Sequence, residues 1–321
     1  MSTPTPRMQA VVQDRFGGPE VLRLAEVGRP EPGPTEILVR VRAAGVNPVD
    51  VKTRAGEGIA GWLGDPPFTL GWDVSGVVEA VGFGVTLFRP GDEVYGMPRF
   101  PHAGAAFAEY VTAPSRHFAR KPAGLTHAEA AALPLAALTA WQILVDTADV
   151  REGQRVLVHA AAGGVGHLAV QIAKARGAHV TGTSGPAKAD FVRSLGADEV
   201  LDHTAVRFED VVRDADVVVD SVGTPSHQLR SLAVLRRGGL LVAVPSGVDP
   251  ETARQAEERG VRATGILVEP DRAALEAITA LVESGELRVE VSAELPLAEV
   301  AKAHALVETG RTRGKVVLTL A

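Results

Sequence analysis

The stretch RVLVHAAAGGVGHLAVQIAK, residues 155–174, combines an apolar run, a glycine-rich turn and an amphipathic segment. The apolar run predicts a buried strand of a parallel sheet. The segment after the turn predicts a helix, whose shared apolar face consists of Val165, Leu168, Ala169, Ile172 and Ala173. Free backbone N–H groups and the positive end of the helix dipole meet at such a junction. The stretch therefore predicts an anion-binding turn at the edge of an α/β sheet.

Three glycines shape this turn. Gly163 and Gly164 would let the backbone approach a pyrophosphate closely, and Gly166 would let the helix pack against the strand. The pattern G-x-G-x-x-G is incomplete, because Ala161 stands where its first glycine falls. A tight strand-to-helix turn that binds no ligand is the alternative.

The chain after residue 150 alternates apolar strands with helical segments. The predicted strands cover residues 155–161, 179–184, 199–203, 216–223 and 238–244, and the predicted helices cover 166–177, 187–196 and 226–237. Continuous apolar strands between amphipathic helices are typical of a parallel sheet covered on both faces. This half of the chain therefore predicts a doubly wound α/β fold.

The chain before residue 120 consists of short β-rich runs broken by glycine and proline, which predicts a compact, barrel-like β unit. Thr126 and Glu129 form a capping box that opens an Ala-rich helical stretch, and Pro134 interrupts that stretch. The segments 298–310 and 315–320 predict a final helix and a closing strand. A length of 321 residues fits two domains.

Composition excludes several classes of protein. The net charge is −6 and aromatic residues make up 4%, so neither a positive field nor a base-stacking surface favours nucleic acid. The absence of cysteine excludes disulfides, Cys-based zinc sites and iron–sulfur clusters. No basic leader followed by an apolar core and no apolar run of about 20 residues is present. We therefore expect a cytoplasmic protein without a membrane segment.

Six ordered motifs carry a resemblance to a known family: NPVD (47–50), DVSGVVEAVG (73–82), GDEVYG (91–96), AAAGGVG (160–166), DSVG (220–223) and RGKVVL (313–318). The chain resembles the zinc-independent quinone oxidoreductases, the zeta-crystallin-like members of the medium-chain dehydrogenase/reductase superfamily. The resemblance implies a GroES-like, mainly β catalytic domain at 1–124, completed by 290–321, and a Rossmann domain at 125–289. It also implies an active site in the cleft between the domains, and a homodimer joined through an edge strand at 238–244.

The end of the second predicted strand favours NADPH over NADH. An NAD-specific site usually places a carboxylate there, whereas this chain has Gly182, Thr183 and Ser184, followed by Lys188. A carboxylate about 4 Å from a 2′-phosphate would cost about 4 kcal/mol at an effective dielectric constant of about 20. Ser184 and Lys188 are expected to bind that phosphate. The alternative is that Ser184 caps a helix and Lys188 is solvated.

The resemblance carries over further cofactor contacts by position. With the turn and the strand end, the expected cofactor-binding residues are Asn47, Thr139, Ala162, Gly163, Gly164, Val165, Gly166, Thr183, Ser184, Lys188, His203, Val222, Ser246 and Val268. His203 departs from the family pattern, in which tyrosine is common. It is expected to stack on the adenosine ring or, alternatively, to lie on the surface.

No metal site is expected. Zinc-dependent relatives take a Cys from the segment that here contains Asn47, and a His from the segment that here contains Trp72 and Asp73. The eight histidines other than His203, His159 among them, are expected to be packing or surface residues. Without a Lewis acid, conjugated electrophiles are better substrates than unactivated alcohols or ketones.

Candidate catalytic residues lie in the segment 47–54, which reads NPVDVKTR. Asn47 is a neutral donor, and Asp50 is expected to buttress the loop or to orient Asn47 or a water molecule. Lys52 stands where many family members have tyrosine, and it is expected to stabilise an enolate-like oxygen or donate a proton. A structural ion pair with Asp50 is the alternative for Lys52.

The segment 56–70 supplies the expected substrate contacts, Trp62 and Phe68. It is expected to be a mobile apolar loop, or else an ordinary surface loop with a packed Trp. Together these residues predict an NADPH-dependent oxidoreductase that transfers hydride to quinones, enones or enals. Two alternatives stay open: a biosynthetic reductase of a larger enone or enoyl-thioester, and an NADPH-binding regulatory or structural protein with little turnover.

Overall fold

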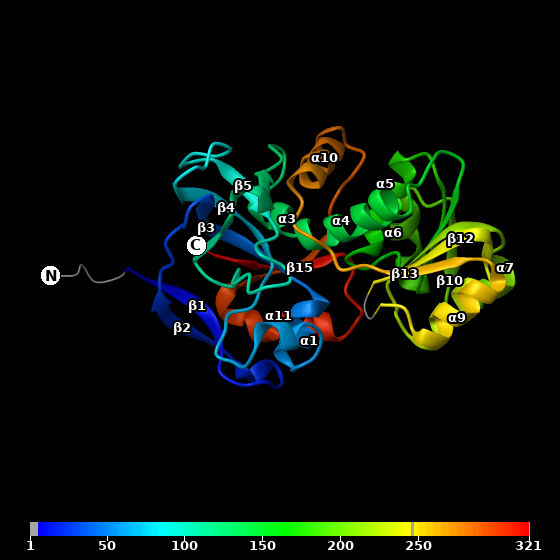
Figure 1. The fold of residues 1–321 in the computed structure, drawn as a ribbon, viewed down its shortest axis with the longest axis horizontal. Coiled ribbons are helices and arrows are strands. Elements are labelled where there is room, and N and C mark those ends of the chain that lie inside the picture. The colour runs from blue at the N-terminus through cyan, green and yellow to red at the C-terminus, as the bar shows by residue number, and fades with distance from the viewer. Residues whose placement is uncertain (1–5, 245–246, 321) are drawn as a thin grey trace. The chain divides into compact units, whose positions relative to one another are not determined.

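A computed structural model describes residues 6–244 and 247–320, which form two compact units (Figure 1). The first unit takes in the chain up to Leu138 together with Glu269–Gly285 and the segment from Val289 onward, and the second comprises Thr139–Val268 and Glu286–Arg288. Although the sequence texture changes near residue 125, α3 (His127–Ala131) belongs to the first unit because it packs on strands of that unit's sheet.

A seven-stranded, mostly antiparallel sheet is the framework of the first unit. Its strand order is β14 (Val291–Pro296), β15 (Lys315–Thr319), β3 (Glu36–Val46), β4 (Asp73–Val81), β5 (Glu93–Gly96) and β7 (Phe118–Arg120), and β6 (Tyr110–Pro114) also pairs with β3. Strands β1 (Arg7–Gln13) and β2 (Leu22–Gly28) form a separate antiparallel pair. The predicted mainly β character of this half of the chain is confirmed.

The C-terminal strand lies inside this sheet. Strand β15 runs antiparallel to β3, with Val316 opposite Val46, and it follows the predicted helix, α11 (Val300–Glu308). Residues from the two ends of the chain therefore share one core. This pairing brings Lys315, the first residue of β15, next to the loop that follows β3.

Short helices cover the first unit. They are η1 (Pro19–Val21), α1 (Pro48–Arg54), α2 (Ala60–Leu63), η2 (Ser115–His117), α3, α4 (Pro134–Trp141), α10 (Arg272–Glu283), η5 (Leu297–Glu299) and α11; α4 continues into the second unit, where the π-helix η3 (Gln142–Thr147) follows. The capping box is confirmed, since the N–H of Glu129 donates to the Thr126 hydroxyl and the N–H of Thr126 donates to the Glu129 carboxylate. Pro134 begins α4, as its lack of an N–H favours.

A six-stranded parallel sheet is the framework of the second unit. Its order is β10 (Glu199–Asp202), β9 (His179–Ser184), β8 (Arg155–Val158), β11 (Ala215–Asp220), β12 (Leu235–Ala243) and β13 (Arg262–Gly265). The helices are α5 (Gly166–Ala175), η4 (Pro186–Lys188), α6 (Ala189–Ser194), α7 (Phe208–Val211), α8 (Pro225–Leu232) and α9 (Pro250–Arg259). Figure 1 shows α5 and α9 on opposite faces of this sheet. The predicted doubly wound sheet is confirmed.

The strand order of this sheet points to a ligand site. From β8 the chain moves outward to β9 and β10, and it then returns to the other side of β8 with β11, β12 and β13. Such a reversal leaves a crevice outside the carboxyl ends of the two strands where it occurs, here β8 and β11.

Among the described residues, every helix is too short or too polar to span a membrane.

Two local predictions were wrong. The segment 238–244 is not an edge strand, because its residues in β12 pair with β11 on one side and with β13 on the other. The edge strand β13 reads RATG, which carries no apolar alternation and so was not recognised as a strand. The predicted helix 226–237 ends at Leu232, because Leu235 already pairs with Ala215 in the sheet.

The central position of β12 predicts its hydrogen-exchange pattern. The backbone N–H groups of residues 240–243 should all exchange slowly, because neighbours on both sides accept from the strand. An edge strand would instead show fast exchange at every second residue. Amide exchange followed by NMR measures this directly, and alternating fast exchange along 240–243 would contradict the strand order.

Candidate functional site

The turn after β8 has the geometry of an anion-binding turn. Ala160 has a φ of 50°, and its carbonyl accepts the N–H of Gly163 at 2.8 Å. Helix α5 begins at Gly166. The N–H of His167 donates to the Gly163 carbonyl, whereas the N–H groups of Gly164, Val165 and Gly166 have no backbone acceptor among the described residues. These groups and the helix dipole face the region outside the carboxyl end of β8.

Close packing around this turn requires glycine. A Cβ atom on Gly166 would lie 2.3 Å from the carbonyl oxygen of Ala160 and 2.8 Å from the Cα atom of Ala161. A Cβ on Gly182, in β9, would lie 2.9 Å from the Cβ of Ala161. Helix, turn and strand are therefore closer together than a larger residue permits, in agreement with the packing role predicted for Gly166.

The end of β9 lies beside the turn. The backbone carbonyl of Thr183 accepts the N–H of Ala161 at 2.9 Å, and the carbonyl of Ser184 accepts the N–H of His203 at 3.2 Å. Thr183 and Ser184 are buried, Lys188 in η4 is half-buried, and His203 is exposed. The structure thus brings together the turn, the strand end and the expected adenosine contact.

One carboxylate near this strand end was missed. Asp202, the last residue of β10, is in register with Ser184 of β9. Its Oδ1 accepts both the N–H of Thr204, at 2.9 Å, and the Thr204 hydroxyl, at 2.7 Å. The hydroxyl and the N–H hold the pKa of Asp202 below its ordinary value. This carboxylate follows the third strand of the unit, so the rule about the second strand did not find it.

The remaining expected cofactor residues lie at several places in the second unit. Val222 is 43% exposed in the loop after β11, where Oδ1 of Asp220 accepts its N–H at 2.9 Å. Thr139 in α4 and Val268 are the first and last residues of the segment Thr139–Val268 of this unit, and both are buried. Ala162 is buried in the turn. The prediction for Ser246 falls outside the described residues.

In the first unit, Asn47 lies in a buried polar cluster. Its N–H donates to Oδ2 of Asp50 at 2.7 Å at the start of α1, and its side-chain Nδ2 donates to Oδ2 of Asp73 at 2.8 Å. The Lys315 ammonium group donates to Oδ1 of Asn47 and, at 3.1 Å, to Oδ2 of Asp73. The N–H of Leu135 donates to Oδ1 of Asp73 at 2.6 Å. The amide of Asn47 is thereby fixed in one orientation.

The side chains of this cluster are buried away from water. Asn47, Asp50, Asp73 and Lys315 are each at most 3% exposed. Burial, with the charge of Asp73 adding to it, raises the pKa of Asp50 to about 8, although the N–H of Asn47 and the Lys315 charge oppose the rise. Asp50 therefore carries a proton near neutral pH, and its carboxyl group accepts the N–H of Asn47.

Lys52 has a different environment. It lies in the last turn of α1 and is half-buried. Among the described residues it forms no ion pair with Asp50, whose Oδ2 is bound to the backbone of Asn47. The structural alternative for Lys52 is therefore not observed.

The two expected substrate residues differ in exposure. Trp62 in α2 is 58% exposed, whereas Phe68 is half-buried, with its ring centroid 6.1 Å from that of Phe16. Backbone hydrogen bonds of 3.0 and 3.2 Å pair Phe68 with Gln13. The end of the loop at Phe68 is thus anchored to β1.

Sequence reasoning missed two members of the buried cluster, Asp73 and Lys315. Both stand in motifs that carried the family resemblance, and a lysine at the start of the apolar strand KVVLT was the available signal. In the described part of the chain, no three His, Asp or Glu side chains form a group that could hold a metal ion.

Comparison with known proteins identifies the family. Residues 33–123 match the family model "Alcohol dehydrogenase GroES-like domain", and residues 195–318 match "Zinc-binding dehydrogenase". The structure of the quinone oxidoreductase from Coxiella burnetii is 37% identical, with a TM-score of 0.93, over 98% of this chain and 100% of that one.

The names of two further relatives mention NADPH. The Escherichia coli quinone oxidoreductase complexed with NADPH is 29% identical, with a TM-score of 0.87, over 97% of this chain and 100% of that one. The NADPH-dependent alkenal/one oxidoreductase, chloroplastic, of Arabidopsis thaliana is 35% identical over 97% of this chain and 79% of its own length. The chain belongs to the quinone oxidoreductase-like family of the medium-chain dehydrogenase/reductase superfamily.

The contact at Gly166 predicts the effect of a single methyl group. Gly166→Ala should lower the free energy of unfolding by about 1–3 kcal/mol, because its Cβ would overlap the Ala160 carbonyl. Gly124→Ala is the matched control, since a Cβ there meets no atom within 4 Å. Urea denaturation measures both variants, and equal stabilities would contradict the close approach.

The raised pKa of Asp50 predicts a pH-dependent stability difference. Because the folded-state pKa of about 8 exceeds the ordinary 3.8, the fold favours the protonated group, and this stabilisation is lost as pH rises from about 4 to 8. Asp50→Asn removes the titration. Relative to wild type, the variant should gain on the order of 2–4 kcal/mol in unfolding free energy between pH 5 and pH 8.5.

Urea denaturation at the two pH values provides the measurement. Asp65→Asn, at an exposed carboxyl group, is the control for removing one negative charge outside the buried cluster. A difference between wild type and Asp50→Asn that stays constant from pH 5 to pH 8.5 would show that Asp50 is ionised throughout.

Proposed function

We propose that the protein is an NADPH-dependent oxidoreductase that reduces quinones or α,β-unsaturated carbonyl compounds without zinc. The observation that carries the proposal is the glycine turn at the carboxyl end of β8, beside β9, which ends in Thr183 and Ser184. The carboxylate in register with Ser184, that of Asp202 in β10, is bound to Thr204. The names of the C. burnetii and A. thaliana relatives support the two substrate classes, and the NADPH complex of the E. coli relative supports the cofactor.

The residues of the second unit fit NADPH. Backbone N–H groups of Gly164 and Val165 would bind the diphosphate, and Gly163, whose own N–H closes the turn on the Ala160 carbonyl, would let the backbone approach it closely. A Cβ on Gly166 has no room there. Ser184 and Lys188 would bind the 2′-phosphate, and His203 would cover the adenine. Ala162, Thr139, Val222 and Val268 complete the proposed contacts. When bound, NADPH supplies the hydride for reduction of the substrate.

The residues of the first unit would prepare the reacting centre. Asn47 would present a fixed amide to the nicotinamide end of the cofactor, because Asp73 and Lys315 hold its side chain and Asp50 holds its backbone. Lys52 would stabilise negative charge on the carbonyl oxygen of the substrate or supply a proton to it. Trp62 and Phe68 would contact the apolar part of the substrate.

Several finer points remain proposals. Candidates for the physiological substrate include larger enones and enoyl-thioesters. The competing proposal for the function is a protein that binds NADPH with little turnover. Assembly as a homodimer and a cytoplasmic location are proposed from the sequence alone. The A. thaliana relative is named chloroplastic, so a location does not transfer within the family.

The proposed 2′-phosphate contact predicts a cofactor-specific effect. Lys188→Met should lower kcat/KM for NADPH about 10-fold or more, because a charge-assisted hydrogen bond contributes about 1.5–3 kcal/mol. The value for NADH should stay unchanged, since NADH has no 2′-phosphate. Lys302→Met, at an exposed lysine paired with Glu299, is the control.

NADPH oxidation is followed with 9,10-phenanthrenequinone, 1,4-benzoquinone, short 2-alkenals and enoyl-thioesters. Turnover with at least one of these classes, and a preference for NADPH over NADH, are expected. Tight NADPH binding with no turnover across the panel would favour the binding-protein alternative. An equal loss for both cofactors in Lys188→Met would contradict the phosphate contact.

A further inference from the structure

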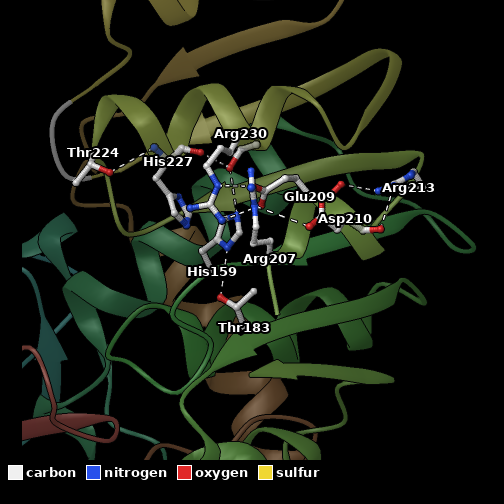
Figure 2. Close-up of polar contacts among 10 residues, drawn as sticks. His159, Thr183, Arg207, Glu209, Asp210, Arg213, Thr224, His227 and Arg230 are labelled. Atoms are coloured by element: carbon white, nitrogen blue, oxygen red, sulfur yellow. Dashed lines mark hydrogen bonds and ion pairs between the residues drawn. The ribbon is translucent and has the colours of Figure 1, made fainter. Parts of the chain in front are cut away.

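A buried histidine lies directly before the glycine turn. His159 follows β8, and it is fully buried. Its ring centroid lies 4.5 Å from that of Phe208 and 4.2 Å from that of His227. Figure 2 shows His159 between Thr183 and the helix that carries His227 and Arg230. The sequence analysis expects His159 to be a packing or surface residue. Packing explains why the ring is buried, but it does not explain the contacts of the two ring nitrogens.

Both ring nitrogens of His159 meet a hydroxyl group. Nδ1 lies 3.3 Å from Oγ1 of Thr183, and Nε2 lies 3.2 Å from Oγ of Ser231. Oγ1 of Thr183 also accepts the N–H of Ala160 at 3.2 Å, and Oγ of Ser231 donates to the carbonyl of His227 at 2.9 Å. The contacts form one continuous chain from the turn to α8.

The two ends of this chain fix the direction of every hydrogen bond in it. The His227 carbonyl can only accept, so it takes the single hydroxyl hydrogen of Ser231. Oγ of Ser231 must then accept from His159, which places the ring proton on Nε2. Nδ1 of His159 is therefore the acceptor for the Thr183 hydroxyl, whose oxygen keeps a lone pair for the N–H of Ala160. Every donor has an acceptor only in this tautomer.

Burial keeps the ring of His159 neutral. Burial, with His227 and Arg230 adding to it, lowers the pKa of His159 to about 3, although Asp220 and Glu209 oppose the fall. Asp220 lies 3.1 Å from Nδ1 of His227. Glu209 pairs with Arg230 and Arg207, as Figure 2 shows. Neutral His159 is thus the form present from pH 5 upward.

The residue at the turn end of the chain needs such support. Ala160 has a positive φ, which disfavours a residue with a Cβ atom. Its carbonyl closes the turn by accepting from Gly163, and it is also the atom that a Cβ on Gly166 would meet. A rotation of the Ala160 peptide would therefore move the N–H groups at the start of α5.

We propose that His159, in its Nε2–H tautomer, is a positioning residue for the cofactor site: through the Thr183 hydroxyl it holds Ala160, and Ala160 holds the turn at 160–166. The proposal rests on the function proposed above for that turn. It also assigns Thr183 a place beneath the turn, since its hydroxyl is engaged by His159 and Ala160. Neither residue would touch the reacting atoms.

The first arm of the test needs no ligand. The ¹⁵N shifts of the His159 ring in the wild-type protein report the tautomer, and we expect a neutral ring with Nε2–H between pH 5 and pH 8. Thr183→Val removes the acceptor of the Ala160 N–H at nearly constant volume, so the amide shifts of residues 160–166 should change. An Nδ1–H tautomer, an imidazolium, or unchanged amide shifts would overturn the proposal.

The second arm measures binding of NADPH. Thr183→Val should raise the Kd and the KM for NADPH about 3- to 10-fold with kcat within about 2-fold, as expected for one lost neutral hydrogen bond. Thr183→Ser keeps the hydroxyl and should restore wild-type affinity. Leu232→Ala, in the core beside Ser231, is the stability control, which should lower the Tm without changing the Kd.

The two arms separate the possible failures. If the wild type does not bind NADPH, the proposed function fails, while the tautomer and the amide shifts still decide the role of His159 in the turn. If the wild type binds NADPH and Thr183→Val binds equally well, the positioning role is wrong and the proposed function stands. Should Thr183→Val not fold, Thr183→Ser and the wild-type ring spectrum still provide the decision.

Discussion

The carbonyl group of Ala160 is the constraint on which the second unit depends. It accepts from Gly163, it leaves no room for a Cβ on Gly166, and it belongs to a residue with positive φ. These conditions set where α5 begins relative to β8, and with it where the helix presents its free N–H groups. A sheet that reverses its strand order at β8 then places this turn at its ligand-binding edge.

Buried polar groups play the corresponding part in the first unit. Asp73 and Lys315 are charges removed from water, and such a pair stabilises a fold little compared with an apolar replacement, yet removing one partner costs about 3–5 kcal/mol. Their geometric effect is clearer, because they leave the Asn47 amide one orientation. In both units, therefore, buried polar contacts next to a loop fix the conformation of that loop. They thereby determine which of its polar groups can bind a ligand.

The sequence predicted what depends on neighbouring residues. The turn at 160–166, the capping box at Thr126 and the alternation of strands and helices follow from local patterns. It did not predict contacts between distant residues, such as that of Lys315 with Asn47, because nothing local specifies which strands pair. The edge strand β13 was missed for a related reason. Its four residues show no apolar alternation, and they form a strand only because they pair with β12.

Amide chemical-shift mapping of the wild-type protein during titration with NADPH tests the central claim most directly. The account predicts saturable binding with the largest shift changes at the N–H groups of residues 163–168 and 183–188, and smaller changes with NADH at 183–188. Saturable NADPH binding that leaves both segments unchanged would contradict it, because the nucleotide would then bind elsewhere on the chain.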